Sequence, residues 1–170
     1  MIYMRIVFFT FIIVIAFDLN SKCKFKNVTT SDEVKYTIQK SINVNDQEGH
    51  VIRIFKTETS HLNPKKNCEG LKLIKTDFFG ISDYIKKNGR VTGYSIGTYD
   101  NGSKIFSKVD GIAHTSEDLT KNGIVNTTIS ITGGSGVYKG VIGYGTGKVE
   151  FNPETGYSSG STETFYSIAK

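Results

Sequence analysis

From Val34 onward, hydrophobic and polar residues alternate in short runs that are bounded by turn-forming residues. Alternation of this kind is typical of a β-strand with one buried face. The pattern predicts eight strands, at residues 34–42, 50–56, 71–79, 90–99, 104–114, 124–132, 141–151 and 161–168. In the first strand, one face is expected to carry Val34, Tyr36, Ile38 and Ile42. No sustained helical period follows, although residues 81–87 are compatible with one helical turn.

Asn-Gly pairs mark two of the connections between these strands, at Asn101-Gly102 and Asn122-Gly123. Asn and Gly readily adopt the positive φ angles of tight hairpin turns. Short strands joined in this way fit an up-and-down barrel or a two-sheet sandwich, and closure into a barrel removes exposed edge strands. The sequence therefore favours an all-β fold, a single eight-stranded antiparallel up-and-down β-barrel of the calycin-like type, with a sandwich as the alternative.

The first residues are organised like a secretion signal. Arg5 precedes an apolar run of 12 residues, at positions 6–17, that is interrupted only by Thr10. A membrane-spanning helix needs about 20 apolar residues, so a cleaved signal is favoured over a permanent anchor. Cleavage is expected after Ala16, with a site near Ser21 as the alternative. The expected organisation is a signal peptide at 1–16, an N-terminal extension at 17–33 and a barrel domain at 34–170, in a secreted or periplasmic protein without stable membrane insertion after cleavage.

Two cysteines, Cys23 and Cys68, remain after removal of such a signal. An exported chain folds in a compartment that permits disulfides. Lys22, directly before Cys23, argues against a lipid attachment site, in which small residues would precede the cysteine. The sequence predicts a Cys23–Cys68 disulfide, with two unrelated thiols as the alternative.

The net charge of the whole chain is +5, and removal of Arg5 from the 21 basic residues leaves 20 against 16 acidic ones. Lysines are spread along the chain without a dense block, which is typical of a solvated surface and not of a nucleic-acid interface. Three N-glycosylation patterns begin at Asn27, Asn101 and Asn126, and they matter only if the source is eukaryotic.

A glycine-rich segment at residues 133–147 is the most distinctive part of the chain. It is not a phosphate-binding loop, because Ile142 stands where the first Walker glycine should be and Val149 replaces the hydroxyl residue. Glycine at every second position of a strand indicates strong bending or close approach by another group. The structural glycines expected here, of which the first three can take positive φ, are Gly133, Gly134, Gly136, Gly140, Gly143, Gly145 and Gly147.

Residues 133–143 resemble the glycine-rich hairpin of allene oxide cyclase-like and dirigent-like barrels. The pattern of those families is similar to Gly-Gly-Thr-Gly, an aromatic, a variable residue, Gly, an aliphatic and Gly, with Ser135 here in place of threonine. The resemblance covers residues 90–151. It implies an eight-stranded barrel whose lumen handles apolar small molecules, as a cyclase in one family and as a guide for radical coupling in the other. No catalytic residue is carried over, because the polar residues of those families lie mainly on other strands.

Three charged residues interrupt otherwise apolar or small faces of the predicted strands. Arg53 alternates with Val51 and Phe55, Asp77 is expected on one face with Leu71, Leu73 and Phe79, and Glu163 is expected beside Phe165. If these faces point inward, the charges could bind a ligand or act as acids and bases; if they point outward, the charges are structural. Arg53, Asp77 and Glu163 are thus the candidate ligand-binding residues, and Arg53 is the candidate anchor for a carboxylate.

The three histidines, His50, His61 and His114, do not have the spacing of a local metal site, and no metal or cofactor is expected. His61 is expected at the surface of a polar loop, and His114 on the outward face of its strand.

Taken together, these patterns predict an exported small β-barrel that binds a small apolar ligand or a protein partner without catalysis. The alternative is an allene oxide cyclase-like or dirigent-like cyclase, isomerase or auxiliary protein that acts on a hydrophobic metabolite. A large lumen lined by charged and aromatic residues would favour the alternative. A lumen filled by side chains would favour a function at the surface.

Overall fold

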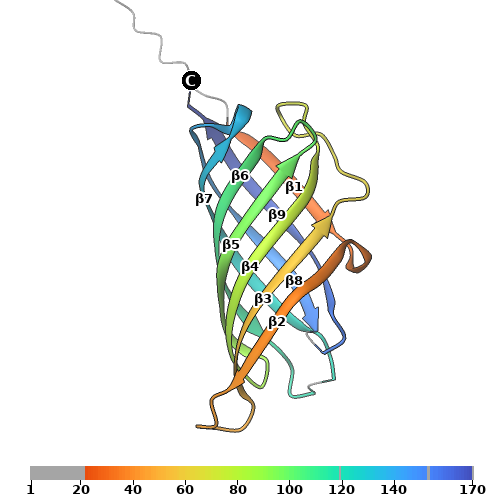
Figure 1. Cartoon of the computed structure of the whole chain (residues 1–170), viewed down its shortest axis with the longest axis vertical. Helices are drawn as coiled ribbons and strands as arrows, with labels where there is room; N and C mark the ends of the chain where they lie inside the picture. Colours follow the sequence, from red (N-terminus) through yellow and green to blue (C-terminus); the bar gives the residue numbers. More distant parts are fainter. Residues whose placement is uncertain (1–21, 119, 153, 170) are drawn as a thin grey trace, which may run out of the picture.

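The computed structural model describes residues 22–118, 120–152 and 154–169 (Figure 1). The predicted signal peptide at 1–16 lies outside these residues. The strands are β1 (Cys23–Thr29), β2 (Val34–Asn43), β3 (His50–Ser60), β4 (Leu73–Ile85), β5 (Asn88–Tyr99), β6 (Lys104–His114), β7 (Gly123–Ser135), β8 (Val141–Asn152) and β9 (Tyr157–Ile168). Two short 3-10 turns, η1 (Ser31–Glu33) and η2 (Gly136–Tyr138), complete the described elements. The described residues include no helix with the length and apolar character needed to cross a membrane.

All nine strands belong to one antiparallel sheet with the order β1-β9-β8-β7-β6-β5-β4-β3-β2. From β2 to β9, every strand pairs with the strand that follows it in the chain. The predicted all-β, antiparallel, up-and-down fold is therefore confirmed. The sheet is one layer that curls round on itself, and not a two-sheet sandwich (Figure 1).

The predicted closed eight-stranded barrel was wrong in strand number and in closure: the sheet has nine strands, and its hydrogen-bonded ladder does not close, because β1 and β2 are its two edges. β1 pairs with β9 only from Cys23↔Tyr166 to Thr29↔Gly160. The chain then turns at η1 and continues as β2 along the free edge of β3. In Figure 1, β1 runs along the upper half of the molecule and β2 along the lower half, where the upper end is the one near the C-terminus.

All eight strands expected from the hydrophobic pattern are present, with ends that shift by a few residues. The ninth, β1, lies in the segment that the sequence analysis treats as an extension. Residues 81–85 continue β4 and do not form a helical turn. A tight hairpin follows in which Lys86 and Lys87 have positive φ angles of 49° and 65°. Lysine is not a usual residue for this backbone, which is why the sequence did not show the hairpin.

Two β-bulges change the expected faces of the strands. The first lies in β2, where the register shifts between Tyr36 and Ile38. One extra residue sends the following side chains to the opposite face. Val34 and Tyr36 therefore point inward, whereas Ile38 and Ile42 are exposed on the outside, so the prediction of one shared face was wrong.

The inner face of the sheet carries two clusters of buried side chains, one near each end. The upper cluster contains Cys23, Phe25, Tyr99, Ile105, Ile131, Tyr138, Val141 and Tyr166. The lower cluster contains Tyr84, Val91, Ala113, Val125 and Phe151. The middle of the inner face lies between them and is not filled in the same way.

The alternating glycines of β8 let β9 pack closely against it. A Cβ atom placed on Gly143 would lie 2.3 Å from the Phe165 carbonyl oxygen, and one on Gly145 would lie 2.4 Å from that of Glu163. Backbone atoms cannot move aside as a flexible side chain can. In the preceding connection, Gly133 and Gly136 have positive φ, whereas Gly134 is not among the positive-φ glycines and is closely approached by two carbonyl oxygens.

Candidate functional site

A cavity of about 290 Å³ lies between the two buried clusters, enclosed by the inner face of the sheet. We call it the inner cavity. Every strand of the sheet contributes to its lining. Bulky apolar side chains provide much of the surface, among them Phe25, Val34, Phe55, Leu73, Phe78, Val109, Ile129 and Val149.

Small hydroxyl side chains form another part of the wall, and most of them come from β3, β4 and β9. On β3, Thr57 and Thr59 point inward and are each 8% exposed. On β9, the run Ser158-Ser159-Gly160-Ser161 lines the cavity without filling it. The small size of these residues leaves room for an occupant, and their hydroxyl groups can orient its polar atoms.

Arg53 is the only lysine or arginine among the lining residues, which include no aspartate or glutamate. Its neighbour across the ladder is Ser41 of β2, and its Nε donates to the Ser41 hydroxyl over 3.4 Å. No ion pair joins Arg53 to a carboxylate within the described residues. The guanidinium is therefore free to pair with an anionic group that is brought in from solution.

Two tyrosines on the inner face, Tyr36 and Tyr84, interact electrostatically with Arg53. Burial raises the pKa of the Tyr36 phenol, and the positive charge of Arg53 partly offsets that rise. Burial and the neighbouring Tyr36 likewise raise the pKa of Tyr84 against the influence of Arg53. Both phenols are therefore protonated near neutral pH and can act as hydrogen-bond donors or acceptors beside the guanidinium.

The other two candidate charges lie on the outer face. A second bulge, between Leu73 and Lys75, places Asp77 on the face opposite Leu73. Asp77 pairs with Lys75 at 3.1 Å and with Lys56 at 3.3 Å. Burial raises the pKa of Asp77, but the two ammonium groups outweigh burial and the net change is downward. These contacts give Asp77 a structural role on the outer surface.

Glu163 belongs to the outer face of β9. Its carboxylate pairs with Lys24 of β1 at 2.9 Å, and its cross-strand neighbours are Thr146 and Lys26. It is not among the residues that line the inner cavity. The pair joins the edge strand β1 to β9 on the outside of the sheet.

His61 is buried, with 9% of its surface exposed, so its expected place at the surface was wrong. It follows the last residue of β3 and lines the upper part of the cavity. Its Nε2 lies 3.0 Å from the Thr76 hydroxyl and its Nδ1 lies 3.4 Å from the Asn27 amide. Burial lowers the pKa of His61 against a smaller opposite influence from Glu33, which keeps the ring neutral near pH 7. His114 is exposed, as expected.

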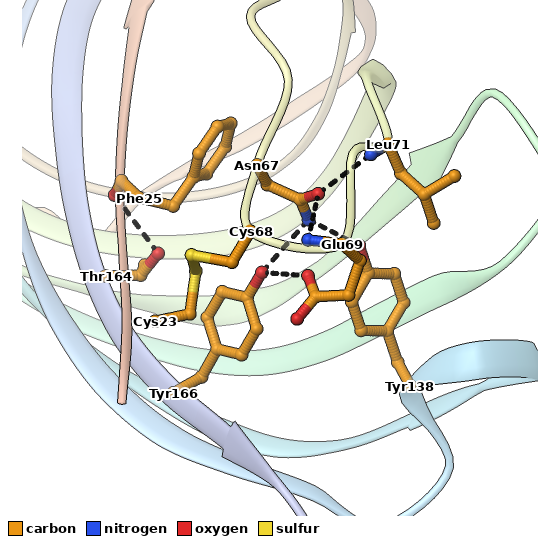
Figure 2. The surroundings of a disulfide bond; sticks show 9 residues. All are labelled: Cys23, Phe25, Asn67, Cys68, Glu69, Leu71, Tyr138, Thr164 and Tyr166. Atoms are coloured by element: carbon orange, nitrogen blue, oxygen red, sulfur yellow. Dashed lines mark hydrogen bonds between the residues drawn. A yellow bond between two sulfur atoms is a disulfide. The ribbon is translucent and has the colours of Figure 1, made fainter. Parts of the chain in front are cut away.

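The upper end of the cavity is closed by the connection between β3 and β4, residues 61–72, which we call the strap. The Cys23–Cys68 disulfide ties the strap to β1 and confirms the predicted pairing (Figure 2). Beside it, Asn67 donates to the hydroxyls of Tyr138 and Tyr166, and the Tyr166 hydroxyl donates to Glu69. The Asn67 carbonyl accepts from the backbone of Glu69 and Leu71. The disulfide is consistent with folding in an oxidising compartment.

No cluster of three or more His, Cys, Asp or Glu side chains suited to a metal ion occurs in the described part of the chain. The polar groups that line the inner cavity are hydroxyls and phenols, the Asn27 amide, the His61 imidazole and the Arg53 guanidinium. Searches for related proteins found no matching family model and no matching curated protein.

Sequence reasoning identified Arg53 but missed the hydroxyls and tyrosines around it. The sequence feature that could have indicated the hydroxyl groups is the run Ser158-Ser159-Gly160-Ser161. This run lacks the hydrophobic alternation that would show which of its side chains point inward. Tyr36 was expected on an apolar face, but the bulge that separates it from Ile38 leaves no mark in the sequence. Tyr84 was missed because residues 81–87 were left outside the predicted strands, as a segment compatible with one helical turn.

Proposed function

We propose that this chain is an exported binding protein that encloses a small apolar ligand in the inner cavity without catalysis. The observation that carries the proposal is an interior that is apolar and unfilled between two well-packed ends. Its volume of about 290 Å³ is at the lower end of the range of ligand pockets, about 300 to 1,000 Å³. A dry apolar cavity of about 150 Å³ holds one benzene ring, so two fused rings are a reasonable size for the enclosed part.

The lining favours binding over an allene oxide cyclase-like or dirigent-like activity on a hydrophobic metabolite. General acid-base catalysis uses groups whose pKa lies near the working pH. The only histidine that lines the cavity, His61, contacts Thr76 and Asn27, and its pKa is lowered by burial. The tyrosines have raised pKa values and are poor bases. These groups are suited to orienting a ligand.

Arg53 gives this site a preference for ligands that carry an acidic group. It is a cation without a carboxylate partner on an otherwise uncharged and largely apolar wall. A guanidinium can hold a carboxylate through two parallel hydrogen bonds. The ligand is thus proposed to be a small apolar molecule with one anionic group.

Calorimetric titration with 1-naphthaleneacetate tests the proposal. Saturable binding is expected for the wild type, and Ser95→Phe, which fills the middle of the cavity, should weaken it at least about tenfold. Ser130→Phe is the matched control, because Ser130 is exposed on the outer face. Thermal unfolding of each variant shows that it is folded. Absence of binding by the wild type, or equal binding by folded Ser95→Phe, would reject the proposal.

The role of Arg53 is tested separately with a neutral ligand of the same size, 1-naphthaleneethanol. Arg53→Leu should weaken binding of the acid about tenfold or more and leave binding of the alcohol nearly unchanged. Lys40→Leu, on the exposed outer side of β2, makes the same change in net charge and serves as the control. Equal loss for both ligands would reject Arg53 as the anchor while leaving the cavity as the binding site.

A further inference from the structure

The wall of the inner cavity has one stretch that no ladder of hydrogen bonds covers. β1 stops pairing with β9 at Thr29↔Gly160. The first residues of β9, at 157–159, therefore pair with β8 on one side only. Opposite them runs β2, which pairs with β3 alone, and no hydrogen bond joins β2 to β9 among the described residues. We call this stretch between β2 and residues 157–159 the lower seam.

Above the lower seam, side chains of β1 and η1 make contacts with the strap across the gap in the ladder. The Cys23–Cys68 disulfide is one bridge. The Asn27 amide reaches the His61 ring over 3.4 Å, and the Glu33 carboxylate accepts from the Leu62 backbone at 2.7 Å. These contacts close the upper half of the gap with a covalent bond and two polar contacts. Comparable bridges across the lower seam do not occur among the described residues.

The two ends of the cavity are also closed. At the upper end, Tyr138 and Tyr166 are 0% and 2% exposed and are tied to the strap through Asn67. At the lower end, the rings of Tyr84 and Phe151 contact each other, with centroids 5.7 Å apart. A ligand could pass either end only if a packed cluster were disrupted.

The inner cavity reaches the lower seam from inside. Its lining includes Val34 and Tyr36 on one flank of the seam and Ser158 and Ser159 on the other. Beyond the bulge, the β2 residues opposite Phe55 and Arg53, which are Gln39 and Ser41, are exposed to solvent. The contact between Arg53 and Ser41 is exposed as well. Arg53 thus lies at the boundary between the inner cavity and the solvent.

The free backbone edges on both sides of the seam support the same conclusion. A backbone N–H or C=O without a partner in the sheet must be satisfied by water or by another molecule. Solvent therefore reaches the seam along β2 and along residues 157–159. The seam is a solvent-exposed slot that leads into a largely apolar chamber, whereas packed side chains close the two ends.

We infer that the natural ligand is an amphiphile larger than the cavity: its apolar end is enclosed, while its polar end remains in the lower seam beside Arg53 and projects into solvent. This inference rests on the proposed function and extends it to the ligand class. A fully enclosed ligand is limited to about 290 Å³, whereas a ligand held at a lateral opening has no size limit on its polar end. The part of the ligand that connects its apolar end to its polar end then passes between Tyr36, Arg53 and Ser158, and these residues limit its width.

A matched pair of neutral ligands tests this inference, namely N-methyl-1-naphthaleneacetamide and the same amide with a polyethylene glycol chain in place of the methyl group. Both have the same apolar end and the same linkage and differ only in the size of the head. Wild-type protein should bind the two with affinities within about threefold of each other. If the small amide binds and the polymer-linked amide does not, the ligand is fully enclosed and the inference is overturned. If neither amide nor 1-naphthaleneacetate binds, the proposed function itself fails.

A nitroxide on the head locates the opening. In the spectrum of ¹⁵N-labelled protein, the nitroxide-bearing amide should broaden the backbone signals of residues 39–43 and 157–159. The chemically reduced, diamagnetic ligand is the control for effects that are not due to the radical. Broadening centred on the strap, at residues 61–72, or on the lower hairpin at Lys86 and Lys87 would place the opening at an end of the cavity and contradict the lateral slot.

Discussion

Gly145 shows how a single residue without a side chain determines the spacing between two strands. A Cβ atom there would lie 2.4 Å from the Glu163 carbonyl oxygen and 3.0 Å from the Thr164 Cα, and both are backbone atoms of β9. Because β9 lines the cavity with small residues, displacing it would alter the cavity wall as well as the ladder. The repeated glycines therefore connect the most distinctive sequence motif of the chain to the shape of its interior.

Gly145→Val is expected to lower the free energy of unfolding by about 1 to 3 kcal/mol, the usual cost of overpacking. Gly97→Ala is the control, since a Cβ at Gly97 meets only the end of the Leu73 side chain at 3.0 Å and a carbonyl oxygen at 4.0 Å. Urea unfolding measures both. A Gly145→Val protein as stable as the wild type would show that β8 and β9 do not need this close approach.

Ionisation of the buried Tyr138 phenol, which belongs to the upper cluster, makes the stability of the protein depend on pH. Burial raises the pKa of its phenol from 10.0 to about 12, while a hydrogen bond with Asn67 acts in the opposite direction. The unfolded phenol loses its proton near the ordinary value, but the folded one keeps it. Its contribution to stability is therefore complete below about pH 10 and is lost as the pH rises toward 12.

The urea midpoint is expected to fall steeply above about pH 10. In Tyr138→Phe the fall should be shallower, because one of the buried phenols that drive it is gone. Tyr144→Phe, at an exposed position of β8, should leave the steepness unchanged. Equal steepness in all three proteins would show that the buried phenol does not contribute to alkaline unfolding.

Among the elements of the fold, the strands with regular alternation were predictable, because a half-buried strand needs an apolar residue at every second position. β1 was not, since its sequence CKFKNVT has only seven residues and buries only Cys23 and Phe25. The bulges in β2 and β4 were also invisible, although they decide which side chains face the cavity. The sequence left the facing of Arg53 open, and the structure places it on the inner face together with Phe55, with no bulge between the two residues.

The Cys23–Cys68 disulfide joins the edge strand β1 to the strap. The bridge closes a loop with a sequence separation of 45 residues. The chain-entropy relation gives about 4 kcal/mol for a loop of this length. The double substitution of Cys23→Ser and Cys68→Ser is expected to lower the free energy of unfolding by about that amount, as measured by urea unfolding.

Wild-type protein treated with a reductant is the matched control for the disulfide prediction, and it should lose a similar amount of stability. If the double-serine protein and the reduced wild type both remain within about 1 kcal/mol of the oxidised wild type, the bridge does not hold the strap and β1 in place.

Across the whole molecule, the inner cavity is to be compared with the exposed apolar surface as a place where an apolar ligand could bind. One exposed patch lies on the outer face of β2 to β5 and includes Ile42, Ile54, Ile81, Phe79 and Tyr94. Ile54 pairs with Ile81, and Phe79 with Tyr94, so these side chains are neighbours across the ladder. The outer patch is open to water on one side, whereas the cavity surrounds an occupant.

Intermolecular nuclear Overhauser effects between bound 1-naphthaleneacetate and the methyl groups of the protein show directly where the ligand binds. Contacts to Val109 and Ile129, which line the inner cavity, are expected. Contacts confined to Ile54 and Ile81, on the outer patch, would show that the ligand binds the surface and would contradict a binding protein with an internal site.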